Sequence, residues 1–403
     1  MKKSIFAITG VALLMRLFCG NVGQSTFTND VITREMENVA VVQTEDIDLH
    51  LQAKSCYLMD TATQSVIYQY NEEKCLPIAS MCKIMTLTLV FETIEKGDLQ
   101  LDEKICISER AASMGGSQVF LEANGRYGVG ELIKSIVICS ANDSCVALAE
   151  RIAGNETFFV NKMNEKAKEL GADNTLFANC TGLPKEPQYS CAKDVAIMLN
   201  NLLQYDVYYQ YGNVWMDKFM HPEGRYTEIT NTNKLIRFYD GCDGGKTGFT
   251  NEAGFCLAAT AKRDNMRIVG VVIGEETSAN RFDDVRTMFD YAFANYTVTP
   301  IVDAEKALDQ TATVLGGKKK SVSLYAERTL YDFHKRGEQS NCQIQFVMQD
   351  LRAPIKQREQ IGEIILFKDG IECSRTSLLS GENVKRANLF DRIKDIANGW
   401  NAR

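Results

Sequence analysis

The chain has 403 residues, of which 45% are hydrophobic and 24% are charged, and these proportions are those of a globular protein. One ordinary hydrophobic core is too small for a chain of this length, so two domains are expected. The formal net charge of -7, together with the lack of a long basic stripe in the sequence, excludes nucleic acid as an expected partner.

The first residues have the form of a secretory signal. Two lysines precede an apolar stretch at residues 5–15, and Arg16 ends this stretch before it reaches the roughly 20 apolar residues that a membrane-spanning helix needs. We therefore predict a signal peptide at residues 1–24, a linker at residues 25–47, and export to the outer face of the cell membrane or to the cell wall.

The sequence contains 13 cysteines, none of them in a C-x-x-C pattern, so a zinc or thioredoxin-like site has no support. An exported protein would usually pair its cysteines. Several of them, including Cys139, Cys145 and Cys256, instead lie in apolar segments, where a free thiol packs as a small hydrophobic side chain. We predict that most are unpaired. No metal or organic cofactor is implied.

Residues 48–298 are expected to form the first domain, with both hairpins and helices. Apolar alternation around polar turns predicts two β-hairpins, at residues 55–71 and 254–274. Helical spacing of apolar residues predicts helices that begin near Ser80 and that cover Glu131–Ile152 and Phe158–Leu170. This mixture favours an α+β fold in which helices cover an antiparallel sheet.

The character of the sequence changes close to residue 299. Residues 299–380 contain short alternating strands, including a hairpin that turns at Lys368-Asp369-Gly370, and they predict a small all-β domain. Residues 384–403 predict an amphipathic helix with Trp400 on its apolar face. Such a helix either docks on its own protein or lies in a membrane interface, and we favour the membrane.

A Ser-x-x-Lys pattern begins the helix near Ser80. Either Ser80 caps this helix, or the Lys83 amine faces the Ser80 hydroxyl and activates it as a nucleophile. The same pattern recurs at Ser190 and Lys193 before another helical run, where we interpret Ser190 as a helix cap. The sequence has no G-x-S-x-G elbow, and its three histidines lie in no catalytic motif, so a serine nucleophile would need lysine as its base.

Two further motifs follow Ser80 in the chain, Ser140-Ala141-Asn142 and Lys246-Thr247-Gly248. Each tripeptide alone is a weak signal. The ordered trio S-x-x-K, S-x-N and K-T-G is the set found in penicillin-binding proteins and class A β-lactamases. The order of the three motifs therefore favours the nucleophile interpretation of Ser80.

The sequence around these motifs resembles the D-alanyl-D-alanine carboxypeptidases, which are low-molecular-mass penicillin-binding proteins. The resemblance includes LMDTATQSVIY, PIASMCKIMT, GGSQVFLE, SANDSCVALAE, NCTGLP, NTNKL, DGGKTGFTNEAG and LRAPI. It implies a penicillin-binding/β-lactamase-like domain, a β-rich second domain and a C-terminal membrane anchor. It also implies peptidoglycan stem peptides ending in D-Ala-D-Ala as substrates and β-lactam antibiotics as covalent inhibitors.

The resemblance assigns roles to the motif residues. Ser80 would attack the carbonyl between the two D-alanines, with Lys83 as its base. Lys246 would supply a second positive charge that keeps the Lys83 amine neutral. Ser140 would relay a proton to the leaving amine, and Asn142 would hold the substrate amide and help to position Lys83.

The remaining implied residues bind charge on the substrate. The backbone N–H groups of Ser80 and Phe249 would form the oxyanion hole. Thr247, Gly248 and Arg281 would bind the terminal carboxylate, because a hydroxyl and a guanidinium suit this group. The alternative for Arg281 is an ordinary solvated arginine on the surface.

Three rival functions are compatible with the same fold. A β-lactamase shares the trio, but the E-x-x-L-N context of the class A deacylating glutamate is missing from the sequence. A DD-endopeptidase would use the same site on crosslinked peptides, and a degenerate wall-binding module would keep the fold without turnover. Because Cys75, Cys82 and Cys139 lie beside the motifs, we also predict that peroxide inactivates the enzyme through these thiols.

Overall fold

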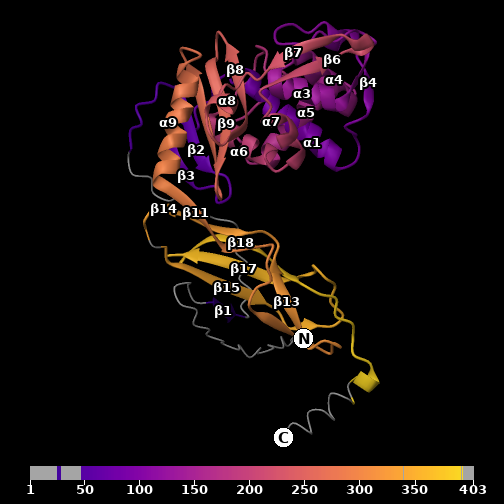
Figure 1. Cartoon of the computed structure of the whole chain (residues 1–403), viewed down its shortest axis with the longest axis vertical. Helices are drawn as coiled ribbons and strands as arrows, with labels where there is room; N and C mark the ends of the chain where they lie inside the picture. The colour runs from indigo at the N-terminus through magenta and orange to yellow at the C-terminus, as the bar shows by residue number, and fades with distance from the viewer. Residues whose placement is uncertain (1–24, 29–46, 339, 392, 394–403) are drawn as a thin grey trace, which may run out of the picture. The chain divides into compact units, whose positions relative to one another are not determined.

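The computed structural model describes residues 25–28, 47–338, 340–391 and 393 (Figure 1). The described chain falls into two compact units. The first lies within residues 42–295, and the second contains the residues from Tyr296 onward together with the short strand β1 (Ser25–Thr28). The predicted signal peptide lies outside the described residues.

The first unit contains a five-stranded antiparallel sheet with the strand order β3-β2-β10-β9-β8. Both predicted hairpins are confirmed, since β2 pairs with β3 and β9 pairs with β10. The strands are β2 (Ser55–Asp60), β3 (Val66–Tyr70), β8 (Cys242–Thr250), β9 (Gly254–Arg263) and β10 (Met266–Glu275).

Helices cover both faces of this sheet. Side chains along β10 point alternately to one face and to the other, so neighbouring residues of this strand contact different helices. Gly270 faces α9 (Asn280–Asn295), where a Cβ atom would lie 2.8 Å from the ring of Phe289. The neighbouring Val269 and Val271 belong instead to the core shared with α6 (Ala192–Leu202) and the helical lobe. The predicted α+β fold with a helix-covered antiparallel sheet is confirmed.

The helical lobe is built around α1 (Lys83–Glu95), in which every residue from Lys83 to Phe91 is buried. A helix that is buried on all sides forms the centre of a core. The larger helices around it are α3 (Val129–Cys139), α4 (Asn142–Ala153) and α5 (Glu156–Glu169). Short elements complete the unit: η1 (Ala79–Cys82), β4 (Lys104–Cys106), α2 (Glu109–Ala112), β5 (Arg126–Gly128), η2 (Asp206–Tyr208), α7 (Tyr209–Gly212), β6 (Met216–Met220), η3 (Pro222–Gly224), β7 (Tyr226–Thr230) and α8 (Leu235–Phe238).

The single helix predicted over Glu131–Ile152 is wrong. Ser140 adopts the left-handed conformation, with φ of 65°, and Ala141 is extended, so α3 ends and α4 begins at this point. The helix predicted over Phe158–Leu170 is confirmed as α5, which begins slightly earlier because the Asn155 side chain caps it by accepting a hydrogen bond from the Phe158 N–H at 2.9 Å.

The second unit is an all-β fold, as predicted. Its larger sheet has the order β1-β15-β17-β18-β13-β12-β16, and β11 pairs separately with β14. Its core includes Leu324, Phe346 and Leu366. The strands are β11 (Tyr296–Val302), β12 (Thr311–Leu315), β13 (Ser321–Ala326), β14 (Leu330–Lys335), β15 (Cys342–Met348), β16 (Leu351–Arg352), β17 (Gln360–Lys368) and β18 (Ile371–Ser380).

The predicted hairpin at Lys368-Asp369-Gly370 is confirmed. Lys368 pairs with Ile371, and the two residues between them, Asp369 and Gly370, both have positive φ, which is the geometry of a type I′ turn. Strand β1 lies inside the predicted linker and pairs in parallel with β15. Most of the predicted helix at residues 384–403 lies outside the described residues.

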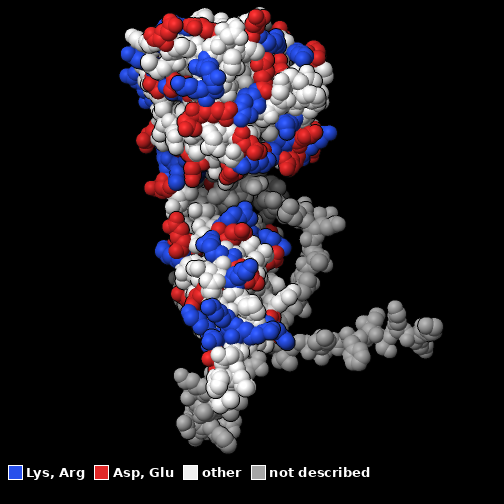
Figure 2. All heavy atoms as spheres, turned by 90° about the vertical axis from the view of Figure 1, so that its right-hand side faces the viewer, with Lys and Arg blue, Asp and Glu red and all other residues white. Residues whose placement is uncertain are grey.

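The surface of the first unit mixes acidic and basic side chains on the face shown in Figure 2, while basic side chains gather near one end of the second unit. Within the part of the chain that the structure describes, no helix has the length and apolar character needed to cross a membrane.

Candidate active site

Ser80 lies in the short helix η1, and its half-buried side chain does not cap a helix. The N-cap of η1 is Ile78 and that of α1 is Cys82, and neither end has a side-chain cap hydrogen bond. Ser80 Oγ instead lies 2.9 Å from Lys83 Nζ. The cap interpretation of Ser80 is therefore wrong, and the serine and the lysine of the motif are in direct contact.

Lys83 is buried completely in the lobe. Besides Ser80 Oγ, its amine contacts the backbone carbonyl of Thr181, at 2.5 Å. Burial lowers the pKa of Lys83, because an ammonium ion in a low-dielectric interior loses its hydration. A lowered pKa increases the fraction of neutral amine at neutral pH, and a neutral amine has the lone pair that a general base needs.

Lys246 comes from the other side of the site, on the edge strand β8. Its side chain is buried, and Nζ donates to the Thr247 carbonyl at 3.1 Å. Burial, followed by the positive charge of the nearby Lys83, holds the pKa of Lys246 well below its ordinary value. Two buried ammonium groups repel each other, so a charge on one amine of this pair disfavours protonation of the other.

The break between α3 and α4 brings Ser140 and Asn142 into the interior. Asn142 Nδ2 donates to the Gly115 carbonyl at 2.7 Å, and the Asn142 N–H donates to the Ser117 carbonyl at 2.7 Å. Ser140 Oγ and Asn142 Oδ1 are both buried and have no hydrogen-bond partner within the described chain. Buried polar atoms without partners are uncommon in folded proteins, and these two are available to a substrate.

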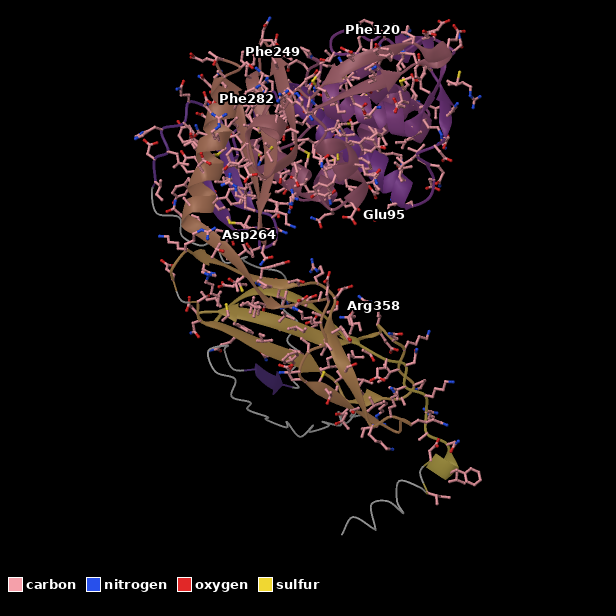
Figure 3. The ribbon with its side chains drawn as sticks, in the orientation of Figure 1. Glu95, Phe120, Phe249, Asp264, Phe282 and Arg358 are labelled. Atoms are coloured by element: carbon pink, nitrogen blue, oxygen red, sulfur yellow. The ribbon has the colours of Figure 1, made fainter. Side chains whose placement is uncertain are left out.

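Strand β8 passes directly behind Ser80. A Cβ atom on Gly248 would lie 2.6 Å from the Ile78 carbonyl oxygen and 3.3 Å from the Ser80 nitrogen, so only glycine allows this approach. Phe249 follows, with its ring half exposed and stacked on Phe255 at a centroid distance of 4.3 Å. Figure 3 shows Phe249 at the same end of the unit as Phe120.

Arg281 is held against the K-T-G strand. One of its nitrogens donates to the Gly248 carbonyl at 3.1 Å, and the guanidinium lies 4.8 Å from the ring centroid of Phe282. Burial lowers the pKa of Arg281 to about 10, which leaves it cationic at neutral pH. The solvated surface interpretation of Arg281 is therefore wrong. Thr247, in the same strand, donates from Oγ1 to Thr232 Oγ1 at 2.8 Å.

The second Ser-x-x-Lys pattern has a different environment. Ser190 is buried, and its hydroxyl oxygen lies 2.7 Å from Thr175 Oγ1. The N-cap of α6 is Cys191, so the interpretation of Ser190 as a cap is wrong. Lys193 points away to the surface and forms an ion pair with Glu73 at 2.7 Å.

The twelve cysteines that the structure describes are free thiols. Cys82 is buried beside Lys83 and donates to the Asn179 carbonyl at 3.3 Å. Burial raises the pKa of Cys82, and it raises the pKa of Cys139 to about 12. Because peroxide reacts with thiolates, these two positions argue against the predicted peroxide sensitivity. Cys75 is exposed.

The sequence interpretation missed the segment that holds Lys83. Thr181 contacts Lys83 through its backbone carbonyl, and the type of side chain at this position gives no sign of such a contact. Gly182 has φ of +81°, and a Cβ atom there would lie 2.9 Å from the Ser80 nitrogen. The detectable signal was the glycine in NCTGLP, because a positive φ and a close backbone approach both require glycine.

A serine that contacts a buried lysine, beside a Ser-Ala-Asn turn and a Lys-Thr-Gly edge strand, is the arrangement of the penicillin-binding proteins and the serine β-lactamases. The three sequence motifs are thus together in one unit. Among the described residues, no group of three or more His, Cys, Asp and Glu side chains is arranged to hold a metal ion.

Comparisons with known proteins narrow this class. Residues 39–277 match the family model described as D-alanyl-D-alanine carboxypeptidase, and residues 296–386 match the C-terminal domain of penicillin-binding protein 5. The chain therefore belongs to the D-alanyl-D-alanine carboxypeptidase family, whose members are serine-type peptidases.

Individual relatives agree with this assignment. The chain is 39% identical to the D-alanyl-D-alanine carboxypeptidase DacF of Bacillus subtilis, over 88% of this chain and 91% of the relative. It is 32% identical to DacC of Escherichia coli, over 86% and 88% respectively. The crystal structure of penicillin binding protein 5 from Haemophilus influenzae superposes with a TM-score of 0.67 at 28% identity, covering 83% of this chain and 98% of that one.

Proposed function

We propose that this protein removes the terminal D-alanine from peptidoglycan stem pentapeptides through an acyl-enzyme on Ser80. The observation that carries the proposal is the 2.9 Å contact between Ser80 Oγ and the fully buried Lys83 amine. Family membership supports the reaction type, and the geometry supports the assignment of each role.

In the acylation step, neutral Lys83 accepts the Ser80 proton as Oγ attacks the carbonyl carbon between the two D-alanines. The carbonyl oxygen becomes an oxyanion and receives hydrogen bonds from the backbone N–H groups of Ser80 and Phe249. The tight packing of Gly248 against the Ser80 backbone supports this pairing, because it brings β8 close to the nucleophile.

The tetrahedral intermediate then breaks its C–N bond. The proton taken by Lys83 passes through Ser140 to the leaving amine, and free D-alanine departs. Asn142 holds the amide of the acyl chain. The unpartnered, buried Ser140 Oγ and Asn142 Oδ1 within the described chain support these roles. Water subsequently attacks the ester, which releases the shortened peptide as a carboxylate and returns the proton to Ser80.

Binding of the terminal carboxylate is assigned to Thr247, Gly248 and Arg281. The hydrogen bond from Arg281 to the Gly248 carbonyl supports this group, since it holds a cation beside the Thr247 hydroxyl. A β-lactam also carries a carboxylate next to a reactive amide, so the same residues would orient it for acylation of Ser80.

We further propose that residues 1–24 direct export, that residues 48–298 form the catalytic domain and residues 299–380 the β-rich domain, and that residues 384–403 bind a membrane surface. A basic cluster supports the last point. It consists of Lys318, Lys319, Lys320 and Lys385, with the Lys318 N–H donating to the Lys385 carbonyl at 2.9 Å. Lys318 and Lys319 also form ion pairs with Asp391 and Glu382. Positive charge near the start of this segment favours an anionic lipid surface.

The test is D-alanine release from a diacetylated peptide ending in Lys-D-Ala-D-Ala, with Ser80→Ala beside the parent protein. We expect release from the parent alone. If the parent releases nothing although penicillin acylates Ser80, as seen by intact mass, the activity is that of an endopeptidase or a β-lactamase. Cleavage of crosslinked dimers and sustained nitrocefin turnover distinguish these two, and a protein that is not acylated at all is a wall-binding module.

A further inference from the structure

Two cysteines flank the β-bridge between Leu76 and Ser190. The bridge is antiparallel, and its two residues exchange both backbone hydrogen bonds, at 2.8 Å from the Leu76 N–H and at 3.0 Å from the Ser190 N–H. In an antiparallel pairing, the residue before one partner lies opposite the residue after the other. Cys75 therefore lies opposite Cys191, in the segment that leads to Ser80.

The backbone position of this pair suits a disulfide bond. Residues next to a doubly hydrogen-bonded pair form a non-hydrogen-bonded pair, in which the Cα atoms are about 4.5 Å apart and both side chains point to the same face. Disulfide bonds usually join Cα atoms that are about 4.4–6.8 Å apart. Cys191 has extended backbone, with φ of -128° and ψ of 166°, which is compatible with continued pairing at this position.

The surroundings of the two thiols place them close together by a second route. Cys75 Sγ lies 3.8 Å from the Asn174 carbonyl oxygen, and the Asn174 N–H donates to the Asp194 carboxylate at 2.8 Å. Burial raises the pKa of Cys191 to about 12, and the charges of Asp194 and Cys75 add to this rise. Both groups therefore lie near the Cys191 thiol, as the strand pairing requires.

The two thiols differ in their access to solvent. Cys75 is exposed, whereas Cys191 is fully buried. An external oxidant therefore meets Cys75 first, and the neighbouring buried thiol is placed to resolve the product. Further contacts hold the two segments together during this reaction, because the Lys193 N–H donates to the Glu72 carbonyl at 3.1 Å and Lys193 Nζ pairs with Glu73 at 2.7 Å.

We propose that Cys75 and Cys191 form a disulfide bond when the protein meets a small-molecule disulfide such as oxidised glutathione, and that this bond fastens the segment before Ser80 to the start of α6. The Cys75 thiolate attacks one sulfur of oxidised glutathione, which breaks its S–S bond, forms a mixed disulfide and releases one glutathione. Cys191 then loses its proton to water and attacks Cys75 Sγ, and the second glutathione leaves. The two protein thiols are oxidised, and one oxidised glutathione is reduced to two glutathione thiols that take up the two protons.

The expected consequence is a more stable catalytic unit. A bond between positions 75 and 191 closes a long loop, and cross-linking a long loop removes much conformational entropy from the unfolded chain. We expect the oxidised protein to melt about 5–10 °C above the reduced protein. Reduction with dithiothreitol should reverse this shift.

The test incubates the full chain with oxidised glutathione, alkylates the remaining thiols after denaturation, and digests the protein with trypsin without reduction. Cleavage after lysine gives residues 75–83, which contain Cys75 and Cys82, and residues 186–193, which contain Cys191. We expect these two peptides to be linked, with Cys82 alkylated. A mixed disulfide on Cys75 should appear at early times, because the raised pKa of Cys191 makes its attack slow.

Three variants make the result specific. Cys75→Ser should lose both the link and the rise in melting temperature, whereas Cys106→Ser, which removes another exposed thiol, should keep both. Cys191→Ser should retain glutathione on Cys75. The inference is overturned if no linked peptide forms at equilibrium, if the mixed disulfide persists on the parent protein, or if a link survives Cys75→Ser. None of these measurements depends on the reaction at Ser80.

Discussion

Ser80 and Ser190 begin the same Ser-x-x-Lys pattern, yet their lysines differ in every physical property that matters for catalysis. Lys83 is fully buried, contacts Ser80 Oγ and has a lowered pKa because of that burial. Lys193 is partly exposed, and its hydrogen bond with Glu73 raises its pKa. A lysine held in its ammonium form by a carboxylate has no lone pair to accept a proton.

The two serines are also held differently. Ala79, directly before Ser80, has φ of 47°, and Gly182 and Gly248 approach the Ser80 nitrogen closely. Ser190 forms a β-bridge with Leu76, and its hydroxyl is occupied by Thr175. Ser190 thus supports the segment that leads to Ser80. The comparison shows that the Ser-x-x-Lys spacing alone does not activate a serine. The lysine must also be buried in contact with the serine hydroxyl.

The largest expected contrast comes from replacing each serine. Ser80→Ala removes the nucleophile, so D-alanine release and penicillin acylation should fall by at least about 10⁴-fold. Ser190→Ala should leave kcat/KM unchanged but lower the free energy of unfolding by about 1–3 kcal/mol, because Thr175 loses a buried partner. Release assays and urea unfolding measure the two effects. Loss of activity in Ser190→Ala at full stability would contradict this division of roles.

Replacing the lysines should give the next largest difference. Lys83→Met keeps the apolar stem but removes the base, and we expect acylation by penicillin to slow by about 10²–10⁴-fold. Lys193→Met removes a surface ion pair and should change the free energy of unfolding by no more than about 1 kcal/mol, with normal acylation. Stopped-flow acylation kinetics provide the measurement. Comparable rates for the two variants would mean that Lys83 is not the base.

Glycine substitutions test the packing around Ser80. Gly182→Ala would place a Cβ atom 2.0 Å from the Ala79 carbonyl oxygen, so the nucleophile must shift, and we expect acylation to slow by at least about tenfold. Gly171 has a similar φ of +74° but no neighbour within 4 Å. Gly171→Ala should therefore cost only the about 1–2 kcal/mol of left-handed backbone strain and leave the rate unchanged. Equal rates in both variants would show that the approach of Gly182 does not position Ser80.

The pH dependence of acylation should also separate the two lysines, with no expected change from Lys193→Met. Only the neutral Lys83 amine is a base, so acylation should rise about tenfold per pH unit below the Lys83 pKa and level off above it. Because this pKa is lowered, the plateau should begin below the ordinary lysine range. Acylation rates from about pH 5 to about pH 10 test this expectation. Lys193→Met should leave the profile in place, and a shift would assign the titration elsewhere.

The spacing of apolar residues along the sequence predicted most of the helices and strands correctly, but it predicted the geometry of the site only in part. The hairpins at residues 55–71 and 254–274 follow from alternation, which depends on neighbours in the chain. The helix predicted over Glu131–Ile152 is wrong because its apolar spacing continues across Ser140, where the backbone turns left-handed. The apolar pattern was unaffected by the break, since both α3 and α4 face the same core.

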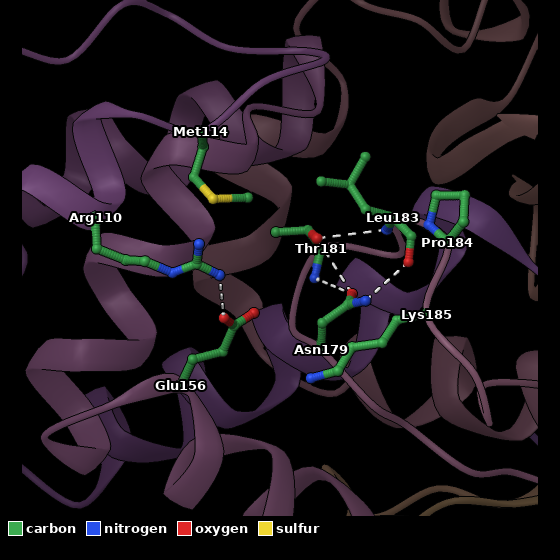
Figure 4. A pocket seen from close by; sticks show the side chains of 8 residues that line it. All are labelled: Arg110, Met114, Glu156, Asn179, Thr181, Leu183, Pro184 and Lys185. Carbon is green, nitrogen blue, oxygen red and sulfur yellow. Dashed lines mark hydrogen bonds and ion pairs between the residues drawn. The ribbon is translucent and has the colours of Figure 1, made fainter.

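The sequence by itself determined the order of the three motifs, the α+β class and the family resemblance, because these depend on residue type and spacing. Only the tertiary structure decided which Ser-x-x-Lys pair has a contact between its two side chains. The pKa of a lysine depends on the atoms that exclude water from it, and for Lys83 these come from segments far away in the chain, such as the Thr181 carbonyl. The same folding brings Arg110, Glu156 and Lys185 together around one cavity (Figure 4), which no local pattern indicated.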